Sequence, residues 1–398
     1  MNGRTESGAS AEREVRLLAV LQALLLTNGA AAIALNGLVG HALARDKSLA
    51  TLPVTGWVTG AALTTFFASL WMKRFGRRSG FGLGALVGIA GAGLCCVALV
   101  RRDFWTFVGG ASLFGVHSAF GQYYRFAAAE LAPPEQRARA VSVVLAGGLF
   151  GGVLGPSLAR WTKDALPTPY LGAYLSSIGV LIVALAVVAA LRIPAPTADE
   201  RLGPQRPLAE IAAQPTFIVA VLSAAIGYGT MNLLMTATPL AMGGCGHPFS
   251  AAAGVISAHV IGMFAPSFFT GALIRRFGIP RVLIAGVIIN GSCIAVALAG
   301  LSVAHFWIAL VLLGVGWNFL YVGGTALLTE TYRPAEKAKV EGVNDLSITL
   351  LMAGSSFASG VILERDGWQR LNLVAAPFVA VILIAVLWLG RRRRLQPG

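Results

Sequence analysis

The chain has 398 residues, of which 56% are apolar and only 12% are charged, and its mean hydropathy is +0.73. These values exclude a water-soluble enzyme or binding domain of this length and indicate an integral membrane protein. The net charge of +14 does not indicate a nucleic-acid partner, because the basic residues lie in the connections between apolar runs.

Apolar runs dominate the chain from end to end. A helix needs roughly 20 residues to cross a hydrocarbon core of about 30 Å. Twelve runs are long enough, at residues 16–42, 50–72, 80–100, 105–128, 139–160, 170–192, 213–241, 249–273, 281–300, 305–329, 342–363 and 370–390. The sequence therefore predicts an all-α membrane protein with twelve transmembrane helices.

The basic residues predict how these helices are oriented. With the N-terminus in the cytoplasm, 23 of the 31 Lys and Arg residues lie inside, and the remaining eight lie outside: Arg45, Lys47, Arg101, Arg102, Arg160, Lys163, Arg365 and Arg370. Cytoplasmic loops carry such an excess of basic residues. An even number of crossings then places both termini in the cytoplasm.

A short basic signature occurs twice, as Lys73-Arg74-Phe75-Gly76-Arg77 and Arg275-Arg276-Phe277-Gly278, 202 residues apart. Glu130 and Glu330 repeat in a similar way, each followed by a proline and basic residues. Repetition at half the chain length predicts two similar halves, which is typical of transporters. We expect an N-terminal six-helix bundle at 1–192, a proline-rich cytoplasmic linker at 193–212 and a C-terminal six-helix bundle at 213–398.

The first signature also resembles a motif of the major facilitator superfamily, Gly-x-x-x-Asp-Arg-x-Gly-Arg-Arg, which matches from Arg74 to Arg78. The resemblance covers essentially the whole chain. It implies two pseudo-symmetric bundles around a central cavity and secondary active transport by alternating access, with no enzyme activity and no cofactor. For this chain we expect a monomer in a bacterial inner membrane, in contact with lipids, with a small-molecule substrate and possible coupling to protons as its other partners.

The same resemblance assigns a gating role to the two inner turns. The gating residues are Lys73, Arg74, Gly76, Arg77, Glu130, Arg275, Arg276, Gly278, Glu330 and Asp345. Lys73 stands where the family has Asp, and Asp345 lies in the first turns of the eleventh helix, so we predict that these two residues form a reversed ion pair.

The fifth helix carries two further features. Gly147, Gly151 and Gly155 recur every four residues, which predicts a flat stripe against which another helix packs. The segment Gly151-x-x-x-Gly155-Pro156 also resembles the antiporter motif of the family, although Ala159-Arg160 replaces its closing Gly-Gly, and this favours export weakly. Symport and antiport both stay open. Ala111 stands where the family has a motif arginine linked to proton transfer, which disfavours proton coupling, and the proton-coupling candidates are His259 and Asp345.

In the family, helices 1, 4, 7 and 10 face the cavity. Here they carry Asn28, Asn36, His117, Gln122, Tyr124, Arg125, Tyr228, Asn232, Trp317, Asn318 and Tyr321 as candidate substrate-binding residues. A polar side chain at membrane depth needs a partner, which is either a ligand and water or a neighbouring helix. Both interpretations stay open for each residue.

The charges of these four helices indicate the class of substrate. Their interiors contain Arg125 and no Asp or Glu, which disfavours organic cations because a desolvated cation needs a counter-charge. Trp317 and Tyr321 suit stacking. We therefore predict a neutral or anionic, aromatic organic solute, with Arg125 either binding it or extending to the interface.

Three further observations bear on function. Methionine, cysteine and histidine gather between Met231 and Met263, which leaves export of metal chelates or drugs as an alternative, although no metal-ligand spacing is present and no bound metal is expected. A membrane sensor or scaffold is a third class, disfavoured by the lack of a long polar segment. Gly316-Trp317-Asn318-Phe319 and Gly342-Val343-Asn344-Asp345 are similar to a bacterial branch tied to solutes such as riboflavin or siderophores.

Overall fold

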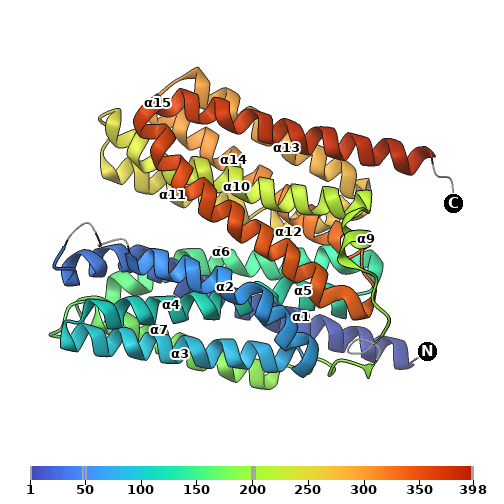
Figure 1. Cartoon of the computed structure of the whole chain (residues 1–398), viewed down its shortest axis with the longest axis horizontal. Helices are drawn as coiled ribbons and strands as arrows, with labels where there is room; N and C mark the ends of the chain where they lie inside the picture. The colour runs from blue at the N-terminus through green and yellow to red at the C-terminus, as the bar shows by residue number, and fades with distance from the viewer. Residues whose placement is uncertain (1, 47–48, 50–51, 199–202, 396–398) are drawn as a thin grey trace. The chain divides into compact units, whose positions relative to one another are not determined.

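The computed structural model describes residues 2–46, 49, 52–198 and 203–395 (Figure 1). These residues form helices and connections, without a β-strand among the described ranges. Residues 199–202 of the predicted linker, and Lys47 and Arg201 of the charge count, lie outside them.

The chain divides into two compact units, which are described separately. The first contains residues 1–131 and 147–204, and the second contains 132–146 and 205–398. The predicted halves assigned 132–146 to the first half. The helices begin with α1 (Asn2–Leu43), α2 (Leu52–Phe75), α3 (Arg77–Arg101), α4 (Phe104–Gly121), α5 (Tyr124–Leu131), α6 (Arg137–Thr162) and α7 (Leu171–Ala190). They continue with α9 (Leu208–Ala212), α10 (Pro215–Gly244), α11 (Phe249–Phe264), α12 (Ser267–Phe277), α13 (Ile279–Ala299), α14 (Val303–Leu328) and α15 (Lys337–Leu395).

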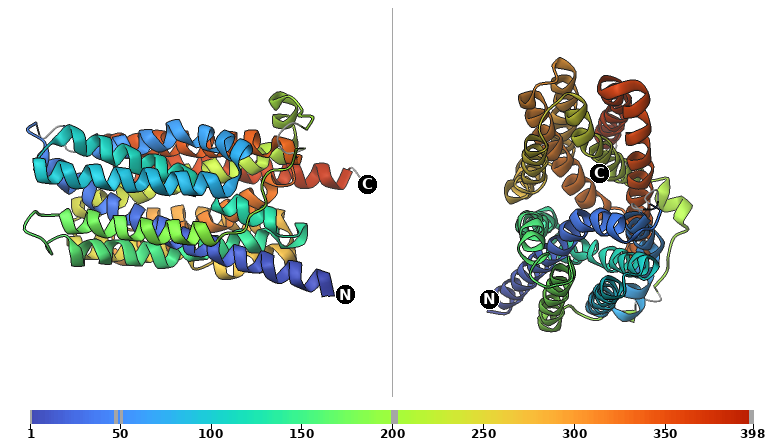
Figure 2. Two further views of the ribbon diagram at one scale, coloured as in Figure 1. Left: turned by 90° about the horizontal axis from the view of Figure 1, so that it is seen from below. Right: turned by 90° about the vertical axis from the view of Figure 1, so that its left-hand side faces the viewer.

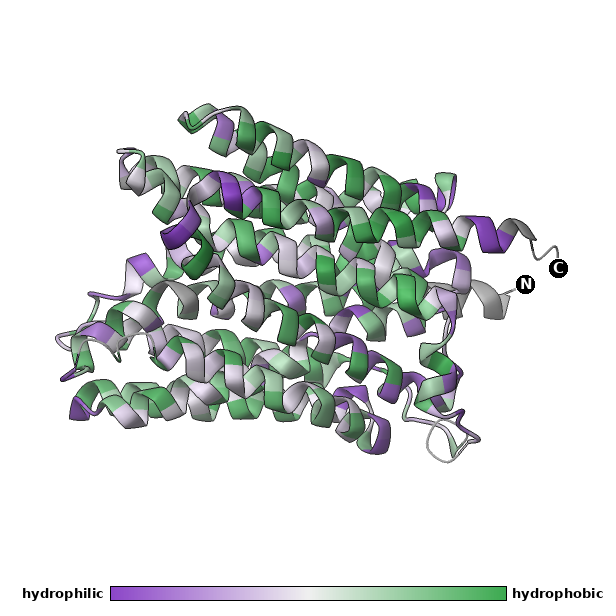
Figure 3. Ribbon diagram, turned by 45° about the horizontal axis from the view of Figure 1, so that its top comes forward, coloured by the Kyte–Doolittle hydropathy of each residue, from purple (hydrophilic) through white to green (hydrophobic). Residues whose placement is uncertain are grey.

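The helices lie where the apolar runs predict them. Within the described residues, nine segments are long and apolar enough to cross a membrane. One of them, Pro334–Arg393, contains the last two predicted spans, which a non-helical glycine at Gly367 separates. Two predicted spans, 50–72 and 105–128, are not among these nine segments, and they correspond to α2 and to α4 with α5. Figure 3 shows that hydrophilic residues gather towards helix ends and connections.

Two predicted spans are interrupted where the backbone loses helical hydrogen bonds. The span at 105–128 breaks between α4 and α5 at Gln122 and Tyr123, and the span at 249–273 breaks between α11 and α12 at Ala265 and Pro266. Pro266 has no N–H to donate, which explains the second break. The first break contains neither Gly nor Pro, so residue type gives no warning of it.

The two basic signatures form the same turn in each unit. Gly76 ends α2 with φ of 90°, and Gly278 ends α12 with φ of 81°. Only glycine adopts this left-handed region without a steric penalty. The predicted role of Gly76 in a tight turn is confirmed.

Close helix packing builds the interior of each unit. In the first unit α4 packs on α2 and α3, and α3 packs on α7. In the second unit α10 packs along α14 and α15, and α13 packs on α14. Figure 2 shows the helices of each unit from the side and nearly end-on. The predicted glycine stripe of α6 is confirmed, since Gly147, Gly151 and Gly155 meet the backbone of α1.

Candidate functional site

In the first unit, the two asparagines of α1 are buried against α7. The Asn36 Oδ1 atom accepts a hydrogen bond of 2.9 Å from the hydroxyl of Tyr174, and Asn28 Nδ2 lies 3.5 Å from the carbonyl oxygen of Ser177. Among the described residues, the Asn28 Oδ1 atom has no hydrogen-bond partner. Asn36 therefore has an interhelical role, whereas Asn28 keeps an acceptor atom available.

Two candidates on α4 and α5 contact α3. The Nδ1 atom of His117 lies 3.0 Å from the carbonyl oxygen of Gly84, so this nitrogen carries the proton and donates. The ring of Tyr124 meets the ring of Phe81 edge-on, with centroids 4.6 Å apart. Both side chains are buried. Their contacts are thus those of a helix–helix interface.

Arg125 is buried beside the break between α4 and α5. Its Nη1 atom donates to the carbonyl oxygen of Gln122 at 2.9 Å and to the Gln122 side-chain oxygen at 3.2 Å. Its guanidinium carbon lies 4.5 Å from the ring centroid of Phe126. With 2% of its surface exposed, Arg125 does not extend into solvent. The break between α4 and α5 explains why Arg125 is buried here, because it leaves the Gln122 carbonyl oxygen free to accept from the guanidinium.

Aromatic rings form a cluster in the second unit. Trp317 and Tyr321 of α14 stack with centroids 4.8 Å apart and an interplanar angle of 18°. Tyr228 of α10 meets both rings edge-on, at 5.3 and 5.5 Å. Phe264 of α11 meets Trp317 edge-on at 5.8 Å. The sequence gives no sign of Phe264, because the helix that carries it is not among the four that face the cavity in the family. The spacing of four residues between Trp317 and Tyr321 is what places them on one helix face.

The indole of Trp317 is a hydrogen-bond donor inside this cluster. Only 2% of the residue is exposed, and its Nε1–H has no hydrogen-bond partner among the described residues. Buried polar groups are rarely left in this state. The cluster thus combines aromatic ring surface with one available donor.

Two further candidates of the second unit bind neighbouring helices. The Asn232 amide donates to the Met352 carbonyl oxygen and to the Ser355 hydroxyl, both at 3.0 Å. The Asn318 amide donates to the carbonyl oxygen of Met263 at 2.7 Å and to the hydroxyl of Ser267 at 2.6 Å. Asn318 thereby satisfies a carbonyl group that the break before α12 leaves open.

An ion pair joins two gating candidates of the first unit. Arg77, at the start of α3, donates to both carboxylate oxygens of Glu130 at the end of α5, and its guanidinium carbon lies 5.5 Å from the ring centroid of Tyr123. Arg78, which the sequence analysis did not select, donates to the carbonyl oxygens of Val188 and Ala189 at 3.3 and 2.6 Å. The chain therefore fixes the start of α3 to two other helices.

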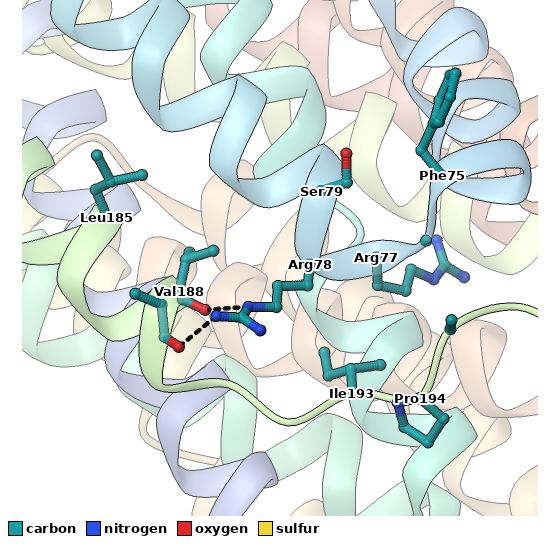
Figure 4. A pocket seen from close by; sticks show the side chains of 11 residues that line it. Phe75, Arg77, Arg78, Ser79, Leu185, Val188, Ile193 and Pro194 are labelled. Carbon is teal, nitrogen blue, oxygen red and sulfur yellow. Dashed lines mark hydrogen bonds between the residues drawn. The ribbon is translucent and has the colours of Figure 1, made fainter.

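Arg77 and Arg78 also line a cavity of about 510 Å³ beside the beginning of the linker, together with Val188 and Ala189 (Figure 4). Arg78 reaches from α3 towards the end of α7, and Ile193 and Pro194 of the linker lie on the same cavity (Figure 4). The Arg78 hydrogen bonds cap the last turn of α7, where the Val188 carbonyl oxygen also accepts from the Leu191 N–H at 3.2 Å.

The gating candidates of the second unit have different neighbours. Arg275 and Arg276 end α12, and the Arg276 guanidinium lies 5.3 Å from the ring centroid of Phe277, as Arg74 lies from Phe75 in the first unit. Glu330 pairs with Arg393 at 2.7 Å, and about two fifths of each side chain is exposed (43% and 42%). Its partner thus comes from α15.

The candidates for coupling lie in both units. The Nδ1 atom of His259 is 2.7 Å from the carbonyl oxygen of Leu310, and this histidine is fully buried. Asp345 accepts a hydrogen bond of 2.8 Å from Asn344. Lys73 and Asp345 belong to different units, and their pairing stays a prediction. Among the described residues, no group of three or more His, Cys, Asp or Glu is arranged to hold a metal ion.

Comparison with known proteins identifies the family. The family model of the Major Facilitator Superfamily matches residues 18–279 and 220–398. The chain belongs to this family, and it is a multi-pass membrane transporter with twelve transmembrane helices in two pseudo-symmetric six-helix bundles.

Relatives are similar over most of the chain. One is the riboflavin transporter RfnT of Brucella anthropi, 40% identical over 95% of this chain and 96% of that protein. Another is the uncharacterized MFS-type transporter YddS of Bacillus subtilis, 30% identical over 89% of this chain and 86% of that protein.

Solved structures share the fold at low sequence identity. The MFS transporter FucP in the outward conformation has a TM-score of 0.81 and 16% identity, over 94% of this chain and 98% of that chain. The human organic anion transporter MFSD10 has a TM-score of 0.74 and 13% identity, over 94% of this chain and 99% of that chain. At such identities the likeness extends to the fold alone.

Proposed function

We propose that this transporter moves riboflavin, or a solute with a similar neutral or weakly anionic aromatic ring system, across the bacterial inner membrane. The relative with 40% identity is a riboflavin transporter, and this supports the choice of substrate. The aromatic cluster of Trp317, Tyr321, Tyr228 and Phe264 is the observation that carries the proposal.

The ring system of riboflavin matches what the cluster offers. A planar tricyclic ring gains stacking energy from aromatic side chains, about 0.5–1.5 kcal/mol for each well-placed pair. Its carbonyl groups and ring nitrogens accept hydrogen bonds, and the Trp317 Nε1–H is a buried donor available for one. A site with such a donor discriminates against analogues that lack the acceptor.

Charge supports a neutral or anionic solute. No acidic residue occurs within the four cavity-facing helices, over 16–42 of α1, 104–121 of α4, 215–244 of α10 and 303–328 of α14. A lipophilic cation would enter such a site without a counter-charge, which is costly in a low dielectric. Arg125 adds positive charge in the first unit and favours anionic groups on the solute.

The remaining features of the proposed cycle follow from the family. We propose transport by alternating access, gated by the inner turns, with His259 or Asp345 as proton carriers and both termini in the cytoplasm. Histidine is the side chain whose unperturbed pKa lies nearest neutral pH. We further propose that the protein works as a monomer made of the halves 1–192 and 213–398.

Export of metal chelates or drugs is the second candidate. The Gly151-x-x-x-Gly155-Pro156 segment and the methionines between Met231 and Met263 favour it. The two candidates differ in what inhibits the protein: lipophilic cations and chelates compete in the second case and not in the first.

Ligand binding to the purified protein tests the proposal. We expect riboflavin to raise the melting temperature, because a ligand that binds only the folded state stabilises it by mass action. Trp317→Ala should weaken binding about tenfold or more through loss of stacking and of the indole donor. Trp161→Ala is the matched control, since this indole is 69% exposed. Stabilisation by lipophilic cations alone would contradict the proposal.

A further inference from the structure

The end of the linker is held in the second unit by a buried carboxylate. Glu336, in the turn between α14 and α15, is fully buried. Arg206 of the linker donates to it three times, from its backbone nitrogen at 2.8 Å, from Nε at 2.9 Å and from Nη2 at 2.6 Å. The backbone nitrogen of Arg333 donates to the same carboxylate at 2.9 Å. The carboxylate is therefore fully satisfied, and the linker supplies most of its donors.

Neighbouring contacts attach the same segment at further points. The Arg206 Nη2 atom and the Gln214 side chain both donate to the carbonyl oxygen of Thr331 at 3.0 Å. The Lys339 ammonium donates to the Arg206 carbonyl oxygen at 2.6 Å. Ile211, in the short helix α9, is fully buried. The linker end is thus bound to the end of α14 and to the start of α15.

The internal repeat explains why the linker takes this position. In the first unit, Arg77 and Arg78 follow the glycine turn and fix the start of α3 to neighbouring helices. Ile279 and Pro280 follow the corresponding Gly278 in the second unit. These two residues carry neither charge nor a side-chain donor, so the second copy of the signature cannot make the equivalent contacts.

The acid that pairs with an arginine at this place also differs between the two units. Among the described residues, Glu330, the counterpart of Glu130, pairs with Arg393, and about two fifths of each side chain is exposed. Exposed pairs contribute little because water and salt screen them. Among the described residues of the second unit three acids are buried, namely Glu336, Glu341 and Asp345, and Arg206 binds the first of them, six residues beyond Glu330.

We infer that Arg206, a linker residue, supplies the arginine that the second basic signature lacks. Residues 205–212 are then a fixed part of the ion-pair and hydrogen-bond network that Arg206 and Glu336 form in the second half. Arg206 is then a positioning residue, which holds the inner ends of α14 and α15 through Glu336. The linker consequently contributes structure and not merely a connection between the halves.

Hydrogen–deuterium exchange of the detergent-purified full chain tests the inference. Glu336→Gln and Arg206→Gln should each raise amide exchange in residues 205–213, about tenfold or more, because they break a buried ion pair. Glu210→Gln is the matched control. Its carboxylate, 59% exposed, faces the same arginine at 3.9 Å, and this variant should exchange at the wild-type rate.

The first unit provides an internal standard in the same experiment. Exchange in α3 and α7 should stay unchanged in all three variants, which shows that the chain is folded. The inference is overturned if Glu336→Gln and Arg206→Gln leave exchange in 205–213 at the level of Glu210→Gln. Since the measurement needs no substrate, a failure of riboflavin binding leaves it unaffected.

Discussion

Placing a methyl group on the glycine stripe of α6 should separate two helices that pack backbone against backbone. A Cβ atom at Gly151 would lie 2.8 Å from the Thr27 nitrogen and 2.9 Å from the Leu26 Cβ, and closer still to the Ala23 carbonyl oxygen. Ordinary contacts of this kind measure 3.4 Å or more. Gly151→Ala therefore requires α1 and α6 to move apart by roughly 0.5 Å at Thr27 and Leu26 and by more at the Ala23 carbonyl oxygen.

The expected cost of this change is that of an overpacked core, about 1–3 kcal/mol. Helix propensity opposes it, because alanine is better than glycine inside a helix by about 1 kcal/mol. The net destabilisation of Gly151→Ala is therefore about 0–2 kcal/mol. The matched control is Gly93→Ala in α3, where a Cβ meets nothing within 4 Å, and this variant should be stabilised.

Thermal unfolding of the purified variants in detergent, followed by tryptophan fluorescence, measures the difference. We expect the melting temperature of Gly151→Ala to fall below that of Gly93→Ala, and transport in reconstituted vesicles to fall with it. Equal melting temperatures for the two variants would refute the reasoning that the α1–α6 interface has no space for a side chain.

Three other predictions concern the helix ends. Gly76→Leu should slow transport in vesicles more than it lowers the melting temperature, because its positive-φ backbone costs a leucine only about 1–3 kcal/mol; the reverse order would contradict a gating role. Lys73→Asp and Asp345→Lys should each abolish transport and together restore it, whereas a double variant without recovery would exclude the pair. The hydrogen bond from Thr106 holds the pKa of Asp103 below its usual range. The cap that Asp103 forms on α4 should therefore stabilise the protein at neutral pH and lose its effect as the pH falls through that lowered pKa, so Asp103→Ala should lower the melting temperature most at pH 7 and progressively less as the solution is acidified through that pKa.

The sequence predicts the helices well, because length and apolarity alone decide where a chain crosses a bilayer. It also predicts Gly76 as a turn and the stripe of α6 as a packing face, since only glycine suits either place. The break between α4 and α5 escapes such reasoning. Gln122 and Tyr123 are compatible with a helix, and the break follows from tertiary contacts such as the Tyr123 hydroxyl bonded to the Thr65 carbonyl oxygen at 2.8 Å.

Candidate binding residues are harder to predict, because periodicity gives the face of a helix and not the partner on it. Asn318 and Trp317 are adjacent in the sequence and both fit a cavity. The Asn318 amide, however, donates to Met263 and Ser267 on either side of the break before α12. The Trp317 indole instead lies in an aromatic cluster, and its N–H has no partner among the described residues. The Arg206–Glu336 pair joins residues 130 positions apart, and no local pattern indicates it.

Uptake of labelled riboflavin into vesicles that contain the purified protein tests the proposed function most directly. We expect saturable uptake in wild type, a loss of about tenfold or more in apparent affinity in Trp317→Ala, and only a mild loss in Arg125→Ala, because neutral riboflavin depends little on the cation. Uptake of anionic aromatic solutes should fall strongly in Arg125→Ala. The absence of saturable riboflavin uptake in wild type, together with transport of lipophilic cations that Arg125→Ala leaves unchanged, would contradict the proposed substrate.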